Sequence, residues 1–368
     1  MTLVHGGNVY ELASRAGCSP DDILDYSASI NPFGPPPGLA DLLGRYFHRL
    51  QHYPDINNRH LIEAISNFHS IAPEYIAAGN GSTELIYWLP RALGIGKALA
   101  VLPTFGEYCK AFEIQGVDVK KVICSPENGF RPELEQLVEA VDDYSPDAVL
   151  LTHPGSPGGL PLSGETMDWV AERSRQGQLF IIDEVFVDFC EEYSFKQFLE
   201  ESRNLVLIRS LTKFYGLPGL RIGYVLTSSR LAGKVRHLVP PWSVNTLAQM
   251  AGAYCLTQED YRHRTLKLVG NQRENMMYEL AAIPGITAFP GTANYLLAAL
   301  DRSLPSAVSL RDDIFAEEKI LIRTCGSFEG LDEWYFRLAV RLPEQNERVL
   351  DAVRRWVARN SASALGSR

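Results

Sequence analysis

One short stretch of the chain combines side chains that could hold a carbonyl compound. The stretch SLTKFYGLPGLRIGY, residues 210–224, places Ser210 three residues before Lys213 and Arg221 eight residues after it. Because the apolar run NLVLIR precedes it, Lys213 is expected just beyond the end of a strand. A desolvated lysine loses its proton more readily, and its free amine can form a Schiff base. A lysine exposed to water is the alternative interpretation.

Two other predicted strand ends carry groups that complement this lysine. Asp183 ends the apolar run LFIID, where a buried carboxylate requires a cationic partner. That partner could be a structural arginine or a ligand. The string GNGSTE brings Gly81, Ser82 and Thr83 to the predicted start of a helix, where free N–H groups favour a phosphate. It lacks the third glycine of the dinucleotide fingerprint, and a simple helix cap is the alternative.

Taken together, these groups match one cofactor. Pyridoxal phosphate has an aldehyde for a lysine, a basic ring nitrogen for a carboxylate, and a phosphate for a helix start with nearby cations and hydroxyls. Asp183 precedes Lys213 by thirty residues, and each follows its own predicted strand. The sequence therefore predicts a site for pyridoxal phosphate at these strand ends.

The elements that position these residues follow an α/β pattern. Apolar runs alternate with segments of helical period, which predicts a mostly parallel central sheet with helices on both faces. In such sheets, ligands bind beyond the carboxyl ends of the strands. The predicted strands are KALAVLP, VDVKKVIC, DAVLLTHP, QLFIIDE, NLVLIRS and LRIGYVLTS.

A change of pattern near residue 258 predicts a second, smaller α+β domain. A long helical segment over 259–283 precedes the strand-like runs TANYLLAAL, ILIRTC and YFRLAVR and a closing helix. We therefore expect a large domain over 45–258. Residues 1–44 and 259–368 would form the small domain with an N-terminal arm.

Composition excludes several classes of protein. The formal charge of −9 and the lack of Lys/Arg clusters argue against nucleic-acid binding. No apolar run reaches the length of a membrane span, and no secretory leader precedes the first runs, which favours a cytoplasmic protein without membrane contact. The six scattered cysteines form no CxxC pair, so neither a metal site nor a disulfide framework is indicated.

Several motifs resemble those of the fold-type I pyridoxal-phosphate aminotransferase superfamily, in its branch of histidinol-phosphate aminotransferases. They are GNGSTE, PTF, IIDEVF and SLTKxxxxPGLRxGY, in the superfamily's order and spacing. The strings HGGNVYELA, PWSVN, ANYLL and ILIRTC resemble more closely the L-threonine O-3-phosphate decarboxylase family of cobalamin biosynthesis. The resemblance implies decarboxylation of L-threonine O-3-phosphate to (R)-1-amino-2-propanol O-2-phosphate, for the cobalamin nucleotide loop, by a homodimer.

The resemblance also implies a role for individual residues. Lys213 would bind the cofactor aldehyde, and Asp183 its ring nitrogen. Phe105 would stack on the ring with Tyr108 behind it. The cofactor phosphate would be held by Gly81, Ser82, Thr83, Ser210, Arg221 and, from the partner subunit, Tyr53. Arg337 would bind the substrate carboxylate. The candidates for the substrate phosphate are His5, Asn31 and Arg323.

The sequence departs from the superfamily pattern at two positions. HPGSPGG replaces the usual NPNNPTG, so Ser156 stands where an asparagine donates to the cofactor's phenolic oxygen. A hydroxyl is shorter than an amide, and water or His153 could fill the gap. Phe186 stands where many aminotransferases have tyrosine.

Four other functions compete with the decarboxylase interpretation. A histidinol-phosphate aminotransferase would use the same cofactor groups. SLTK also matches the SxxK of penicillin-binding hydrolases, but no KTG box follows. A regulatory protein could bind the cofactor without catalysis. His48 and His52 have a metal-binding spacing but no further ligands, so we expect no metal.

Overall fold

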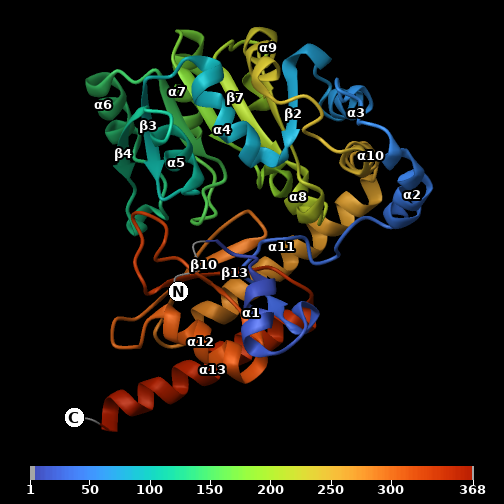
Figure 1. The fold of residues 1–368 in the computed structure, drawn as a ribbon. Coiled ribbons are helices and arrows are strands. Elements are labelled where there is room, and N and C mark those ends of the chain that lie inside the picture. Colours follow the sequence, from blue (N-terminus) through green and yellow to red (C-terminus); the bar gives the residue numbers. More distant parts are fainter. Residues whose placement is uncertain (1–4, 367–368) are drawn as a thin grey trace.

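The computed structural model describes residues 5–366, and a seven-stranded sheet forms the centre of this part of the chain (Figure 1). The strand order is β2-β8-β7-β6-β5-β3-β4, in which β8 is antiparallel to both neighbours and the other pairs are parallel. The strands are β2 (Ile76–Asn80), β3 (Lys97–Leu102), β4 (Asp118–Ile123), β5 (Ala148–Thr152), β6 (Leu179–Asp183), β7 (Leu205–Ser210) and β8 (Ile222–Thr227).

Helices cover both faces of this sheet, as the near-continuous apolar runs predict. Successive side chains of a strand point to opposite faces. Accordingly, Val206 and Ile208 of β7 pack with α4 (Gly81–Leu93), α5 (Glu107–Glu113) and α9 (Ser229–Leu238). Leu205 and Leu207 belong to the core on the other face, which includes α6 (Leu134–Tyr144) and α7 (Gly164–Arg175). The remaining helices of this half are α2 (Leu39–Tyr46), α3 (Arg59–His69), α8 (Leu211–Phe214) and α10 (Thr246–Cys255).

A second sheet lies beneath the first and is antiparallel, in the order β12-β13-β10-β9 (Figure 1). The helices around it are α1 (Val9–Ala16), α11 (Glu259–Ala281), α12 (Ala307–Glu318) and α13 (Pro343–Gly366). Its strands are β9 (Ile286–Phe289), β10 (Tyr295–Leu300), β12 (Arg323–Thr324) and β13 (Tyr335–Ala339).

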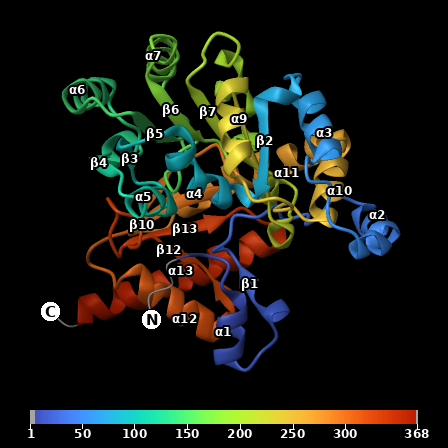
Figure 2. The same cartoon turned by 45° about the horizontal axis from the view of Figure 1, so that its top comes forward.

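The run ILIRTC forms two short strands where the sequence predicts one. β11 (Ile320–Leu321) pairs with β1 (Leu24–Asp25), whereas β12 pairs with β13. The chain therefore changes partner at Ile322. The β1–β11 pair joins the N-terminal segment to the C-terminal part of the chain, and α1 lies beside α12 in both views (Figure 2). The domain limits at 44/45 and 258/259 stay a prediction, and residues 1–4 and 367–368 lie outside the described residues.

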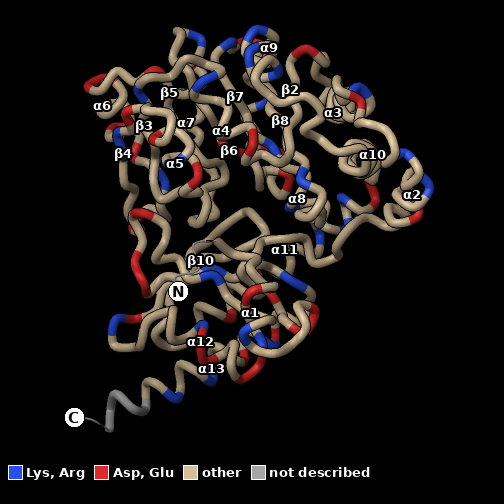
Figure 3. Tube along the Cα trace, viewed as in Figure 1, with Lys and Arg blue, Asp and Glu red and all other residues tan. Residues whose placement is uncertain are grey.

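Charge is mixed over both halves of the molecule. Lys and Arg segments alternate with Asp and Glu segments along the trace (Figure 3). Within residues 5–366, no helix combines the length and the apolar character that crossing a membrane requires. The same residues contain no group of three or more His, Cys, Asp or Glu side chains that could hold a metal ion.

Candidate active site

The carboxyl ends of several parallel strands meet at one edge of the large sheet and line a cavity of about 250 Å³. The cavity extends to the N-terminal arm and to the small sheet. It brings together twelve of the fourteen residues that the sequence assigns to the site: His5, Gly81, Ser82, Thr83, Phe105, Ser156, Asp183, Ser210, Lys213, Arg221, Arg323 and Arg337.

Lys213 lies one turn beyond β7, on α8. Burial, followed by the charges of Arg337 and Arg221, lowers the pKa of Lys213 to about 8, although Asp183 acts in the opposite direction. Its ammonium lies 6.0 Å from the ring centroid of Phe186. A lysine with this pKa is partly neutral near pH 8, so its amine can attack a carbonyl group.

Asp183 ends β6 and is buried at the same edge. Burial raises the pKa of Asp183 to about 6, while the N–H of Val185, Tyr108 and the charge of Lys213 oppose this rise. The Val185 N–H donates to Oδ1 at 3.0 Å. A carboxyl group with a raised pKa gains most from a cation that reaches it, because the cation stabilises its ionised form.

The start of α4 offers backbone N–H groups to an anion. Gly81 has a φ of +79°, and a Cβ built on it would lie 2.6 Å from Nη2 of Arg221. Gly223 of β8 is equally tight, because its Cβ would lie 2.2 Å from the nitrogen of Ser82. The two glycines thus allow a helix start, a strand and a guanidinium to meet within one small volume. This arrangement suits a phosphate group.

Two arginines face the cavity from the small sheet. Arg323 of β12 and Arg337 of β13 are direct partners in the antiparallel register. Nη1 of Arg337 donates to Oγ of Ser156 at 3.3 Å, and its guanidinium lies 4.7 Å from the ring centroid of Tyr295. Nη2 of Arg323 donates to Ser327 at 2.8 Å. Burial and the charge of Arg337 lower the pKa of Arg323 to about 10.

His5 and Phe105 close another side of the cavity. Their ring centroids are 5.6 Å apart, with the planes inclined by 55°. Phe105 also contacts Tyr108 edge to face, at 6.4 Å between centroids. Tyr108 is buried behind it, as the sequence predicts, and burial together with Asp183 raises its pKa well above the usual value.

The structure does not bring Asn31 into the cavity. Its amide donates to the carbonyl oxygen of Phe214 at 2.6 Å and to Oγ1 of Thr265 at 2.9 Å, and its Oδ1 accepts from the Phe33 N–H. Both amide protons are thus used inside the protein in this structure, and the expectation that Asn31 contacts the substrate phosphate stays a prediction. Its backbone N–H donates to the carbonyl oxygen of Lys213 and so also supports the lysine segment.

Tyr53 also lies outside the cavity of its own chain. Its side chain is 79 % exposed and stacks on Trp242, with the ring centroids 4.7 Å apart. This position agrees with the expectation that Tyr53 serves the site of a partner subunit, but does not test it.

His153 cannot fill the gap left by Ser156. Its Nε2 contacts the carbonyl oxygen of Tyr193 at 2.8 Å, and its Nδ1 accepts from the Leu162 N–H at 3.1 Å. Burial lowers the pKa of His153 to about 4, so the ring is neutral and both nitrogens serve the backbone. Of His153 and Ser156, only Ser156 lines the cavity.

Two residues of the cavity and one beside it were not found from sequence. Ser27 and Ser29 line the cavity, and Oγ of Ser29 is buried without a hydrogen-bond partner in the described part of the chain. Glu107 accepts hydrogen bonds beside His5. Serines in a loop and a glutamate at a helix start have no distinctive spacing, so no local signal would have identified them.

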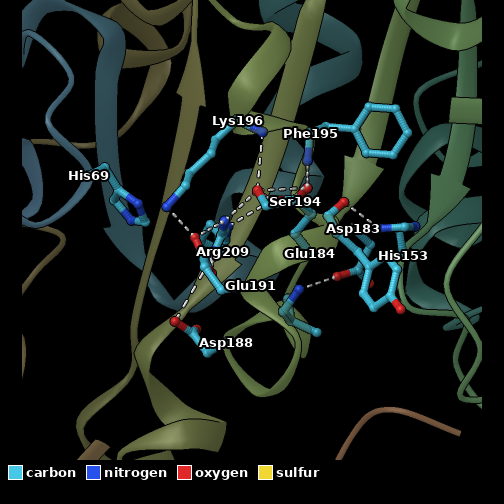
Figure 4. Close-up of polar contacts among 12 residues, drawn as sticks. His69, His153, Asp183, Glu184, Asp188, Glu191, Ser194, Phe195, Lys196 and Arg209 are labelled. Atoms are coloured by element: carbon cyan, nitrogen blue, oxygen red, sulfur yellow. Dashed lines mark hydrogen bonds and ion pairs between the residues drawn. The ribbon is translucent and has the colours of Figure 1, made fainter. Parts of the chain in front are cut away.

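A buried ion network lies beside the ends of β6 and β7 (Figure 4). Arg209, next to Ser210, is fully buried and contacts Glu184 and Glu191 at 2.8 and 2.9 Å. Glu184 follows Asp183 directly. The residues that provide catalytic groups are therefore flanked by residues whose side chains are fixed by ion pairs.

Three polar features of this cavity fit pyridoxal phosphate. A carboxylate with a raised pKa, a lysine with a lowered pKa and an anion site at a helix start correspond to its ring nitrogen, aldehyde and phosphate. Two buried atoms with no protein partner among the described residues, Nε of Arg337 and Oγ of Ser29, offer further polar contacts for a ligand.

Comparison with known proteins identifies the family. The family described as aminotransferase class I and II matches residues 22–353. The chain belongs to this family. It therefore has the fold-type I architecture of pyridoxal-phosphate enzymes, which the strand order and the flanking helices above describe.

Three relatives of this aminotransferase-family chain indicate its branch. A threonine-phosphate decarboxylase of Salmonella typhimurium is 35 % identical, over 95 % of each chain. The crystal structure of L-threonine-O-3-phosphate decarboxylase from Porphyromonas gingivalis matches with a TM-score of 0.81 and 25 % identity, over 91 % of this chain and 100 % of that one. The histidinol-phosphate aminotransferase from Clostridium acetobutylicum matches with a TM-score of 0.85 and 30 % identity, over 92 % and 100 %.

Proposed function

We propose that this chain decarboxylates L-threonine O-3-phosphate to (R)-1-amino-2-propanol O-2-phosphate, the linker of the cobalamin nucleotide loop, with pyridoxal phosphate as its cofactor. The similarity to threonine-phosphate decarboxylases over nearly the whole chain supports this substrate. The observation that carries the proposal is the pair of neighbouring arginines, Arg323 and Arg337, on the small-sheet side of the cavity.

The arginine pair suits a small molecule with two anionic groups. Directly opposed residues of antiparallel strands have their Cβ atoms only about 5 Å apart. Arg221 lies at the anion site at the start of α4, whereas Arg323 and Arg337 line the cavity from the small sheet. L-Threonine O-3-phosphate carries a carboxylate and a phosphate a few bonds apart. Histidinol phosphate itself carries only the phosphate.

The cofactor would be held by residues of the large sheet. Lys213 would bind its aldehyde, Asp183 its ring nitrogen and Ser156 its phenolic oxygen, and Phe105 would cover the ring. Its phosphate would contact Gly81, Ser82, Thr83, Ser210 and Arg221, with Tyr53 from the partner subunit of a homodimer.

Catalysis would depend on which bond at Cα the protein orients for cleavage. When bound, pyridoxal phosphate supplies an electron-accepting ring that takes up the electron pair of a broken Cα bond. Arg337 would hold the carboxylate, and Arg323 with His5 would hold the phosphate, so that these contacts select the bond between Cα and the carboxylate for cleavage. Asp183 would keep a proton on the ring nitrogen. After CO₂ leaves, Lys213 would return a proton to Cα.

Amino transfer is the competing function, because the chain also matches a histidinol-phosphate aminotransferase over 92 % of its length, at 30 % identity against 35 % for the Salmonella typhimurium decarboxylase. The two reactions differ in their products, so one assay separates them. The purified holoenzyme is given L-threonine O-3-phosphate labelled at the carboxyl carbon, without any oxo acid. We expect labelled CO₂ and aminopropanol phosphate in equal amounts over many turnovers.

Two results would overturn this proposal. The first is an oxo product with conversion of the cofactor to its amine form and no release of label. The second is a requirement for an added oxo acid. A parallel assay with histidinol phosphate and 2-oxoglutarate would then establish the amino-transfer function.

A further inference from the structure

We propose that Glu107 is a positioning residue that orients His5 for binding the substrate phosphate. The inference rests on the proposed function, in which His5 contacts this phosphate, and assigns a role to a residue outside the motifs discussed above. Glu107 does not line the cavity, so it would act through His5 and not on the substrate.

The geometry links the N-terminal arm to the large sheet. Nε2 of His5 lies 3.0 Å from Oε1 of Glu107 in the first turn of α5. The hydroxyl of Tyr87, on α4, donates to Oε2 of Glu107 at 2.5 Å. Glu107 is only 12 % exposed, whereas His5 is 50 % exposed. The Glu107 carboxylate therefore belongs to a helix of the large half and contacts the imidazole of His5 in the N-terminal arm.

The arm is fixed on its other side as well. The N–H of Gly7 donates to Oγ of Ser27 at 2.8 Å, and this hydroxyl donates to Asp25 at 2.6 Å. A Cβ on Gly6 would lie 2.1 Å from the carbonyl oxygen of Ser27, so the arm lies directly against the loop that lines the cavity. The ring of His5 thus has a defined place between this loop and Glu107.

Charges of both signs lie around His5. Arg311 and Arg323 line a hollow together with His5, and Arg323 also faces the main cavity. Asp312 pairs with Arg311 at 2.7 Å. Glu107 adds a carboxylate on the Nε2 side of the ring. Burial raises its pKa, but the hydrogen bond from Tyr87 and the charges of Lys110 and His5 together hold the pKa of Glu107 below its usual value.

The ionised carboxylate also decides which protons the imidazole can offer. With Nε2–H donated to Glu107, Nδ1 is an acceptor in the neutral ring and a donor only in the imidazolium form. Nδ1 has no hydrogen bond to any residue in the described range 5–366. Because Glu107 occupies Nε2, Nδ1 is the ring nitrogen that could contact a phosphate oxygen, and the fixed Nε2 contact orients it.

The test compares a phosphorylated ligand with its unphosphorylated form in the holoenzyme. Glu107→Gln keeps a hydrogen-bond acceptor but removes the charge. We expect the KM for L-threonine O-3-phosphate to rise roughly tenfold while kcat changes less than about twofold, since hydrogen bonds to charged groups are the strong ones. Lys110→Ala is the matched control, because Lys110 is 60 % exposed and contacts the same carboxylate from the solvent side, at 3.5 Å.

A binding measurement makes the result independent of the reaction catalysed. Calorimetry with O-phosphoethanolamine, which has no carboxylate to lose, should show the same roughly tenfold weakening in Glu107→Gln. Binding of ethanolamine should not change. In a His5→Ala background, Glu107→Gln should have no further effect. Tyr87→Phe retains the carboxylate and should weaken O-phosphoethanolamine binding less. It replaces Glu107→Gln in the test if that variant folds poorly.

Two outcomes would overturn the inference: equal weakening of both ligands, or a full effect of Glu107→Gln without His5. Failure of the decarboxylase proposal alone would give another result. Glu107→Gln would still weaken the binding of O-phosphoethanolamine in calorimetry, but the holoenzyme would release no labelled CO₂.

Discussion

Lys213 differs from an ordinary surface lysine in its surroundings. Burial and two arginines lower its pKa to about 8, and Asp183 is the carboxylate that most opposes them. The neutral amine is the form that attacks an aldehyde. Its availability should therefore control how fast the cofactor-free protein takes up pyridoxal phosphate.

This environment predicts a pH dependence for cofactor uptake. The neutral fraction of Lys213 grows as pH rises through a lowered pKa, so the uptake rate should increase with pH and level off above about 8. Arg337→Leu removes a charge that lowers this pKa, and should move the midpoint to higher pH. Stopped-flow absorbance after mixing the cofactor-free protein with pyridoxal phosphate measures the rate.

Arg302→Leu is the control for this experiment, because Arg302 is 64 % exposed, pairs with Asp332 and is not among the main charges that act on the pKa of Lys213. It should leave the midpoint unchanged. A rate that keeps rising up to the ordinary lysine range, or a midpoint that Arg337→Leu does not move, would contradict the role of these charges.

At the residue scale, the sequence predicts groups with distinctive chemistry and misses those whose partners are distant. Lys213, Asp183 and the arginines could be predicted because motifs and strand ends mark them. Asn31 could not, because its amide is used by Phe214 and Thr265, which lie 183 and 234 residues away. The contact between Glu107 and His5 could not be predicted either, because the two residues are 102 positions apart.

At the scale of elements, all six strands predicted for the large sheet are present. Five of them are apolar runs that are buried on both faces of the sheet, and such runs give a strong signal, whereas the edge strand β4 is mostly exposed. The two-residue strands β1, β11 and β12 were missed or merged, because so few residues show no periodicity. Their pairing depends on which distant segment is available.

The ion network behind β6 and β7 predicts a large effect on stability. Arg209→Met would leave Glu184 and Glu191 without their buried cation, and should lower the free energy of unfolding by about 3–5 kcal/mol. Urea denaturation followed by circular dichroism measures this change. Adding Glu184→Gln should recover part of the loss, because it removes one uncompensated charge.

Arg175→Met is the matched control, since Arg175 pairs with Glu172 and Glu201 but is 38 % exposed. It should cost less than about 1 kcal/mol. If both arginine variants lose similar stability, the buried network does not hold the strand ends as described.

At the scale of the whole molecule, a group of exposed apolar side chains predicts an interface between subunits. Phe47, Leu50, Tyr53, Ile56 and Trp242 are large apolar side chains, each more than 45 % exposed. Such a concentration is typical of a protein interface. It includes the tyrosine proposed to complete the cofactor phosphate site of a partner subunit.

Mixed dimers test whether Tyr53 acts across subunits. Lys213→Ala should be inactive and Tyr53→Ala strongly impaired. After unfolding and joint refolding, a mixed dimer contains one site with Lys213 from one chain and Tyr53 from the other. Activity should therefore reappear, at up to about half of the wild-type value per mixed dimer, as half-of-sites complementation requires.

If Tyr53 served its own chain, each mixed dimer would contain one site without the lysine and one without the tyrosine. Activity would then not exceed the average of the two parent proteins. Sedimentation of the mixture verifies that dimers have formed.

The central claim is that Lys213 holds pyridoxal phosphate covalently in a cavity where Asp183 contacts the ring nitrogen of the cofactor. Reduction of the holoenzyme with borohydride, followed by proteolysis and peptide mass spectrometry, tests this claim directly. The pyridoxyl group should be found on Lys213, in the peptide that also contains Ser210. A group on another lysine, or no group on any peptide, would contradict the account.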